Sequence, residues 1–187
     1  MAEPEVKTSP VPFAWVASLH LHPERAGGIT KGGPMTDHKT LTLVADKGIV
    51  GNTRYFGRLT KAGKPSPRQI SLIDRSLLME HEMWIGEPEC LPPGRVRSNI
   101  EITHHDPTKE TLTTPNKVMD LLDHLGKKIK IGKTAVIEIT LAREPCWQMD
   151  VIAQGLQRLM GGHKQGVMAR VVVGGEISTG DPLVVMD

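Results

Sequence analysis

Cysteine, aromatic residues and long apolar runs are all scarce in this chain of 187 residues. Its two cysteines, Cys90 and Cys146, lie far apart, and neither belongs to a Cys-x-x-Cys pair. The sequence therefore has no zinc-knuckle or thioredoxin-like motif, and a reducing compartment is the simpler assumption.

Aromatic residues make up only 3% of the sequence, and the formal net charge is +2. Single-stranded nucleic acids are bound through aromatic faces and positive surfaces, so nucleic acid is not an expected partner. No stretch is long and apolar enough to span a bilayer, and the N-terminus lacks the apolar run of a signal peptide. These absences predict a cytoplasmic protein without membrane contact.

The length fits one domain with a sizeable core. Residues 1–10 are polar and interrupted by proline, which predicts a flexible tail ahead of a single domain over residues 11–187. Alternating apolar residues predict strands at residues 13–21, 40–44, 69–73, 95–99, 128–131, 134–141, 167–173 and 183–186. The fold class is therefore mainly β with a few short helices.

Helices are predicted at three places by their capping residues and apolar spacing. One follows Asp74, one runs from Thr114 to a stop at Gly126, and one follows Asp150. The strand over residues 167–173 is expected to turn at Gly174 and Gly175 and to pair with the residues directly after them.

Cys146 is the candidate for chemistry because of where it falls between a strand and a helix. The strand should end near Ala142, and Pro145 blocks its continuation, so that a stiff turn presents Cys146. The start of the next helix and the nearby Arg143 would favour the thiolate, which binds metals and attacks sulfur. The alternative is a small buried side chain with a structural role.

Basic residues in two regions are candidates for binding an anion. Arg58 and Arg68 lie with two lysines in a loop rich in glycine and proline, which either closes over a phosphate-bearing ligand or is simply solvated. Arg95, Arg97 and Asn99 alternate along a predicted strand, so that they would share one face directed at a ligand or at water.

Histidines offer weaker candidates for a metal site. His20 and His22 would share a strand face, but they have no evident third ligand. The triplet 104–106 (His-His-Asp) is followed by proline, and adjacent side chains of an extended segment point opposite ways. We interpret that triplet as a loop.

Seven short segments resemble a known family in their order and spacing. They are residues 48–57, 68–72, 94–100, 143–146, 155–156, 166–177 and 180–181. Together they resemble the MOSC domain, the C-terminal domain of molybdenum cofactor sulfurases. The resemblance implies a β-barrel similar to the barrel domain of pyruvate kinase. One departure is that Asn52 and Thr53 stand where the family has an aspartate.

The resemblance also implies a cofactor and roles for particular residues. Cys146 would be the catalytic residue and the thiolate ligand of molybdenum. The molybdenum cofactor (molybdopterin) would be bound by polar and basic side chains, namely Arg143, Arg97, Asn99, Arg95, Arg68, Arg58 and His163. The metal would reduce N-oxygenated substrates, as in some family members, with electrons from an external donor because no flavin or haem motif is present.

Two other functions stay open. Cys146 could carry sulfur as a persulfide, supplied by a cysteine desulfurase in trans, because full-length sulfurases place a pyridoxal-phosphate desulfurase domain ahead of this one and the chain has no room for it. Alternatively, the protein is a non-enzymatic anion-binding module in which Cys146 is structural.

Overall fold

The computed structural model describes residues 11–22, 35–107, 109 and 120–186. The strands are β1 (Ala14–Leu21), β2 (Thr36–His38), β3 (Thr40–Val44), β4 (Gly48–Ile49), β5 (Ile70–Asp74), β6 (Ile100–Thr103), β7 (Lys128–Ile131), β8 (Ala135–Ala142), β9 (Val167–Val173), β10 (Gly175–Ser178) and β11 (Pro182–Met186). The helices are α1 (Arg75–Ile85), α2 (Gln148–Ile152) and α3 (Leu156–Leu159), with a 3₁₀ turn, η1, at Leu121–His124. The prediction of a mainly β fold is confirmed, whereas the predicted tail over residues 1–10 lies outside the described residues.

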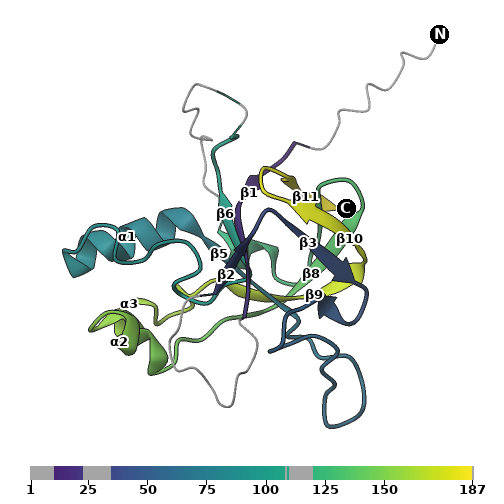
Figure 1. The fold of residues 1–187 in the computed structure, drawn as a ribbon, viewed down its shortest axis with the longest axis horizontal. Helices are drawn as coiled ribbons and strands as arrows, with labels where there is room; N and C mark the ends of the chain where they lie inside the picture. The colour runs from purple at the N-terminus through teal and green to yellow at the C-terminus, as the bar shows by residue number, and fades with distance from the viewer. Residues whose placement is uncertain (1–10, 23–34, 108, 110–119, 187) are drawn as a thin grey trace.

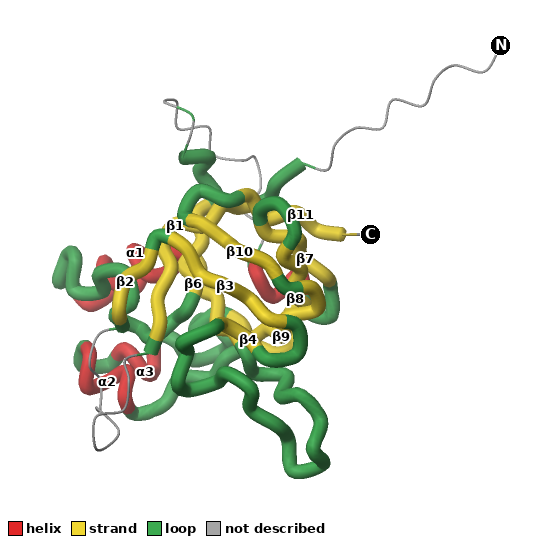
Figure 2. The backbone as a smooth tube through the Cα atoms, turned by 45° about the vertical axis from the view of Figure 1, so that its right-hand side comes forward, coloured by secondary structure: helices red, strands yellow, loops and turns green. Residues whose placement is uncertain are grey.

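Seven strands of the described chain close into a barrel in the order β11-β7-β8-β9-β5-β6-β1. Closure occurs because β1 pairs with β6 on one side and with β11 on the other. Every pairing is antiparallel except that of β5 with β6, which are joined through α1. The short sheet β10-β3-β4 lies against the barrel, and the three α-helices gather on one side of it (Figures 1 and 2). A closed barrel leaves none of these seven strands with a free edge.

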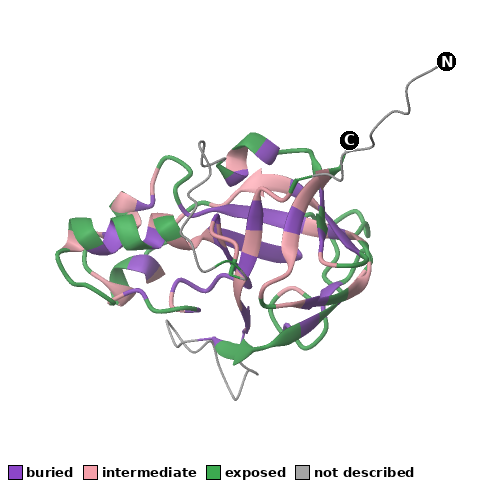
Figure 3. Cartoon of the chain, turned by 90° about the horizontal axis from the view of Figure 1, so that it is seen from above, coloured by how far each residue is buried: buried purple, intermediate pink, exposed green. Residues whose placement is uncertain are grey.

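Aliphatic side chains fill the barrel because apolar residues alternate along its strands. On β8, Ala135, Ile137 and Ile139 are fully buried, whereas Glu138 and Thr140 are only partly buried. Figure 3 shows buried segments along the crossing strands of the barrel. Burial of each large aliphatic side chain stabilises the fold by roughly 1.5–3 kcal/mol.

A second apolar cluster holds the helices to the barrel. Its buried members are Ile73, Leu78, Leu91, Val96, Met149, Leu156 and Met160. As predicted, Asp74 caps α1, and its carboxylate accepts a hydrogen bond from the backbone N–H of Ser76 at 2.8 Å. Met149 of this cluster fixes the chain near Cys146, and Val96 fixes the chain next to Arg97.

Residues 95–99 do not form the predicted strand. The backbone N–H of Arg95 donates to Pro92 and that of Arg97 to Gly94, which makes successive turns, and β6 begins only at Ile100. Arg95, Arg97 and Asn99 therefore do not share a face. Apolar alternation alone could not reveal these turns, in which Arg97 adopts a φ of 63°.

Asn99 is buried in a hydrogen-bond network between strands. Its side-chain oxygen accepts from the hydroxyl of Ser71 at 3.0 Å, and its amide donates to the carbonyl of His20 at 3.1 Å. The side chain thereby links β5 to β1 and is satisfied by the protein itself.

Two further predictions of local structure were wrong. Strand β10 pairs with β3 and not with β9, because glycines at 174 and 175 let the chain cross closely over β3 without turning back. The predicted helix from Thr114 to Gly126 is not continuous. Asp120 is extended and caps the short turn η1, and residues 114–119 lie outside the described residues.

His20 and His22 form hydrogen bonds with different side chains. His20 contacts the carboxylate of Asp37 and the hydroxyl of Ser18, each at 2.8 Å, while His22 contacts the side chain of Asn52 at 2.9 Å. Among the described residues, no group of three or more histidine, cysteine or acidic side chains could hold a metal ion. In the same part of the chain, no helix has the length and apolar character needed to cross a membrane.

Gly166 is required by close packing. Its φ is 82°, and a Cβ there would overlap the carbonyl oxygen of Leu72. Gly166→Ala should lower the free energy of unfolding by more than about 2 kcal/mol, because the left-handed backbone costs roughly 1–2 kcal/mol and the overlap adds to it. Gly57→Ala is the control, since φ is 67° and no atom would lie within 4 Å of the new Cβ. Equal losses in urea unfolding would contradict the proposed overlap.

His104 forms a mostly buried ion pair whose stabilisation should depend on pH. Its Nε2 lies 2.7 Å from Asp74 Oδ2 and its Nδ1 lies 2.9 Å from the carbonyl of Phe13. Two acceptors favour the doubly protonated ring. The hydrogen bond to Asp74 raises the pKa of His104 above 6.5. Burial acts to raise the pKa of Asp74, but hydrogen bonds from His104 and Ser76 outweigh it and lower that pKa below 3.8.

The stabilisation from His104 is therefore complete below pH 6.5 and is lost as the pH rises through the raised pKa. That from Asp74 is present above pH 3.8 and is lost as the pH falls through the lowered pKa. His104→Gln should cost more unfolding free energy at pH 5.5 than at pH 9, by about 1 kcal/mol or more. His38→Gln, at an exposed position, is the control. Equal losses at both pH values would contradict the assignment.

Candidate functional site

Cys146 is exposed at the turn between β8 and α2. Pro145 directly precedes it, and the carbonyl of Cys146 accepts a hydrogen bond from the N–H of Met149 at 2.9 Å. Its thiol lies 3.8 Å from the side-chain oxygen of Gln148. The helix begins at Gln148, so Asp150 is not its cap as predicted. The carboxylate of Asp150 instead accepts from the N–H of Gln157 at 2.8 Å.

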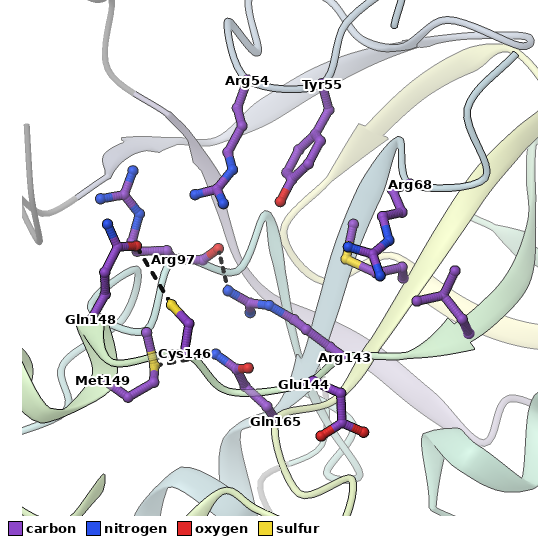
Figure 4. A pocket seen from close by; sticks show the side chains of 12 residues that line it. Arg54, Tyr55, Arg68, Arg97, Arg143, Glu144, Cys146, Gln148, Met149 and Gln165 are labelled. Atoms are coloured by element: carbon purple, nitrogen blue, oxygen red, sulfur yellow. Dashed lines mark hydrogen bonds between the residues drawn. The ribbon is translucent and has the colours of Figure 1, made fainter. Parts of the chain in front are cut away.

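Cys146 opens into a pocket of about 210 Å³ (Figure 4). The residues that line it come from four separate parts of the chain, and they are Arg54, Tyr55, Arg68, Arg97, Leu141, Arg143, Glu144, Cys146, Gln148, Met149, Gln165 and Met168. The loop after β4 provides one wall, and the end of β8 with the start of α2 provides another. Positive charge dominates, since this set contains a single carboxylate, that of Glu144.

Arg143 carries a buried charge that no described carboxylate neutralises. Its Nη2 donates to the carbonyls of Val96 at 3.0 Å and Arg97 at 3.2 Å, while its Nη1 is buried without a hydrogen-bond partner among the described residues. Burial, together with the nearby Arg54 and Arg97, lowers the pKa of Arg143 to about 10. The side chain is still protonated at neutral pH, so an anion bound beside Nη1 would compensate its charge.

Other groups around Arg143 add to the positive potential. Burial, followed by the charge of Arg54, lowers the pKa of Arg97. The guanidinium of Arg54 lies 5.3 Å from the ring centre of Tyr55. Glu144, the one carboxylate of the lining, lies 2.8 Å from His163 Nδ1, and both side chains are exposed. Four arginines outnumber this carboxylate in the lining, so the pocket favours an anion over a cation.

Gln165 adds an unsatisfied acceptor. It is only 2% exposed, and its amide nitrogen lies 3.2 Å from the sulfur of Met149, but its side-chain oxygen is buried without a described partner. A ligand that donates a hydrogen bond would satisfy it. The pocket thus offers a donor at Arg143 and an acceptor at Gln165.

A buried histidine supports the wall formed by Tyr55. His22 packs edge-on against the Tyr55 ring, with ring centres 5.6 Å apart, and contacts the buried Asn52. Burial lowers the pKa of His22 to about 3 despite the hydrogen bond to Asn52, so the ring is neutral near pH 7. Asn52, at the position where an aspartate was expected, therefore faces no positive charge on His22.

The structure brings together four of the residues named from the sequence, which are Cys146, Arg143, Arg97 and Arg68. Four others do not line the pocket, and they are Arg58, Arg95, Asn99 and His163. Cys90 packs against the second apolar cluster, under the helices, and does not line the pocket either.

Sequence reasoning gave no role to Tyr55, Gln148 or the apolar lining residues Leu141, Met149 and Met168. For Arg54 and Tyr55 a signal was present, because they lie in the glycine-bounded segment 48–57 that carried part of the resemblance. Gln165 lies in the glycine-bounded loop that also contains His163, a residue named from the sequence, but only the packing of this loop against α2 buries its side chain.

Comparison with family models identifies the chain. The MOSC domain model matches residues 60–184, and the protein therefore belongs to the MOSC domain family. This family is associated with molybdenum cofactor binding. A comparison with curated protein sequences finds no match.

Solved structures share the fold. The YuaD protein of Bacillus subtilis matches with a TM-score of 0.68 at 20% identity, covering 92% of this chain and 94% of that one. YiiM from Geobacillus stearothermophilus matches with a TM-score of 0.63 at 17% identity, covering 93% and 75%. YiiM from Escherichia coli gives 0.59 at 16%, covering 94% and 71%. These likenesses confirm the MOSC-type barrel.

The positive pocket should bind a simple anion even without a cofactor. Arg54→Gln is expected to weaken the binding of inorganic phosphate about tenfold, because a hydrogen bond to a charged group contributes roughly 1.5–3 kcal/mol. Arg158→Gln removes the same charge from an exposed position on α3, outside the pocket, and should leave the affinity unchanged. Isothermal titration calorimetry would measure both. Equal affinities of the two variants would contradict a phosphate site at Arg54.

Proposed function

We propose that the protein binds the molybdenum cofactor in this pocket, with Cys146 as the protein ligand of the metal. The observation that carries the proposal is an exposed thiol in the same pocket as a buried, unpaired guanidinium nitrogen of Arg143. Soft thiolate suits molybdenum, and guanidinium groups suit the phosphate of a pterin. Residues 11–187 would form the single domain that carries the site.

The arginines have different tasks in this proposal. Two carbonyls hold Nη2 of Arg143, so that the guanidinium is already fixed beside the place where the anion would bind. Arg54 and Arg68 are exposed side chains at the rim and would complete the phosphate contacts. Four other residues named from the sequence would not touch the cofactor and would support the site or the fold only indirectly; they are Arg58, Arg95, Asn99 and His163.

The remaining lining residues would position the ligand and exclude water. Cys146 would hold the metal, with the Gln148 side chain close enough to hydrogen-bond the sulfur or a group beside it. Gln165 would accept a hydrogen bond from the pterin ring. Leu141, Met149 and Met168 supply apolar surface that keeps water from the reacting centre.

When bound, the cofactor supplies a redox metal for two-electron oxygen-atom chemistry. In the reaction we propose, the N–O bond of an N-hydroxylated amine is cleaved to give the amine and water. The conversion consumes two electrons and two protons. Tyr55 is the single hydroxyl side chain in the pocket lining, and it is placed to hold a proton there. The electrons would come from an external donor.

Replacement of the thiol tests the metal ligand directly. Cys146→Ser should reduce the molybdenum content of anaerobically purified protein at least about tenfold, because a hydroxyl is a poor ligand where a soft thiolate is needed. Binding of inorganic phosphate should be retained, since the arginines are unchanged. Elemental analysis and fluorescence of the oxidised pterin measure the two parts of the cofactor.

Cys90→Ser is the matched control, because that thiol does not line the pocket, and it should keep normal molybdenum content. Equal molybdenum content in wild type and Cys146→Ser would overturn the ligand assignment. A labile sulfur adduct on Cys146 without any metal would point instead to a sulfur carrier supplied by a cysteine desulfurase. An unreactive thiol and no cofactor would leave a non-enzymatic anion-binding module.

A further inference from the structure

Beside the pocket, residues 58–68 form a protruding basic hairpin, which we call the basic finger. Figures 1 and 2 show it projecting from the barrel on the side of β4. Its cationic residues are Arg58, Lys61, Lys64 and Arg68. The sequence has no acidic residue between Asp46 and Asp74. The charge of the finger is therefore of one sign, although the whole chain has a formal net charge of only +2.

Backbone hydrogen bonds hold the basic finger in its hairpin shape. Leu59 and Pro65 form an antiparallel bridge, and the N–H of Thr60 donates to the carbonyl of Lys64 at 2.8 Å. The N–H of Ser66 donates to the carbonyl of Arg58 at 2.9 Å. At its base, the hydroxyl of Thr140 on β8 donates to the carbonyl of Pro67 at 2.7 Å. The hairpin is thus anchored to a barrel strand.

The tip and the base of the finger have different surroundings. Arg68, at the base, lines the pocket, as does Arg54 just before the finger. The other three cations are Arg58, at the first residue of the finger, and Lys61 and Lys64, nearer its turn; we call these three the tip cations. They are exposed, do not line the pocket, and form no ion pair with any described carboxylate. The tip cations are therefore not needed to hold a ligand in the pocket, and no described group of the chain neutralises them.

Apolar side chains accompany the tip cations. Leu59 is 59% exposed, and Phe56, just before the finger, is 42% exposed. A surface that combines exposed apolar side chains with uniform positive charge matches a protein interface with an acidic partner. Nucleic acid is favoured less, because Phe56 is the single exposed aromatic side chain next to the finger and base stacking needs more of them.

We propose that the basic finger docks an acidic electron-transfer protein beside the Cys146 pocket. The electron-donating role rests on the proposed function, which needs two electrons for each N–O bond cleaved and has no donor among the described side chains. The partner would be a protein with an acidic surface around its redox group. Attraction to the tip would speed encounter and place that group near the pocket that the base of the finger lines.

The experiment compares two triple variants that remove the same charge. The tip variant is Arg58→Gln with Lys61→Gln and Lys64→Gln. The control is Lys128→Gln with Lys130→Gln and Lys133→Gln, at exposed positions on β7 and the following turn. The probe is flavodoxin, an acidic flavin-containing electron carrier, and its affinity for the full chain is measured at low and high salt.

The tip variant should raise the Kd for flavodoxin about tenfold at low salt and flatten its salt dependence, whereas the control should change Kd less than about twofold. The tip variant should bind inorganic phosphate as tightly as the wild type does. It should also reduce the N-hydroxylated amine at the same rate when dithionite supplies the electrons, because the substituted residues lie outside the pocket. The melting temperature shows that both variants are folded.

Equal affinities of the tip variant and wild type would overturn the docking surface, as would tight binding of a single-stranded RNA in place of flavodoxin. The proposed function fails separately. If the purified protein contains no molybdenum but its flavodoxin binding still depends on the tip cations, the docking surface stands. The role of that surface in electron transfer would then be overturned. Loss of flavodoxin-driven but not dithionite-driven turnover in the tip variant would support both.

Discussion

The guanidinium of Arg143 brings a positive charge into the protein and uses it to hold the site together. One of its nitrogens ties the end of β8 to the carbonyls of Val96 and Arg97, while the other stays buried without a described partner. A buried ion without a counterion destabilises a fold by several kcal/mol or shifts its pKa, and the pKa of Arg143 is indeed lowered to about 10 by burial. In the proposed function, a bound anion would offset this cost.

The barrel makes that arrangement possible. Its closure through β1 brings the end of β8, the turns before β6 and the loop after β4 to one place, although they are far apart in sequence. Gly166 lets β9 start directly against β5, and its carbonyl accepts from the N–H of Arg143 at 2.9 Å. The apolar cluster under the helices fixes Met149 and Val96. The site thus combines a rigid floor with an exposed, cationic rim that continues into the basic finger.

Strands were predicted where the sequence is rich in regularly placed apolar residues, as on β8 and β9 of the barrel and on β3 of the short sheet. Prediction failed at residues 95–99, because a turn with a left-handed Arg97 also alternates polar and apolar residues. It failed for β10 because a Gly-Gly pair signals a tight turn as well as a close crossing of strands. Hairpin geometry is local, whereas the choice of β3 as a partner depends on the whole barrel.

The sequence by itself determined the mainly β class, the cap of α1 at Asp74 and the presentation of Cys146 after Pro145, because these depend on side-chain periodicity and on residues close in the chain. Only the tertiary structure decided which cations meet the thiol. It placed Arg68, Arg97 and Arg143 around the pocket, buried Asn99 between strands, and left the tip of the basic finger in solvent. The physical reason is that charge and hydrogen-bonding capacity are properties of a residue, whereas burial and proximity are properties of the closed barrel.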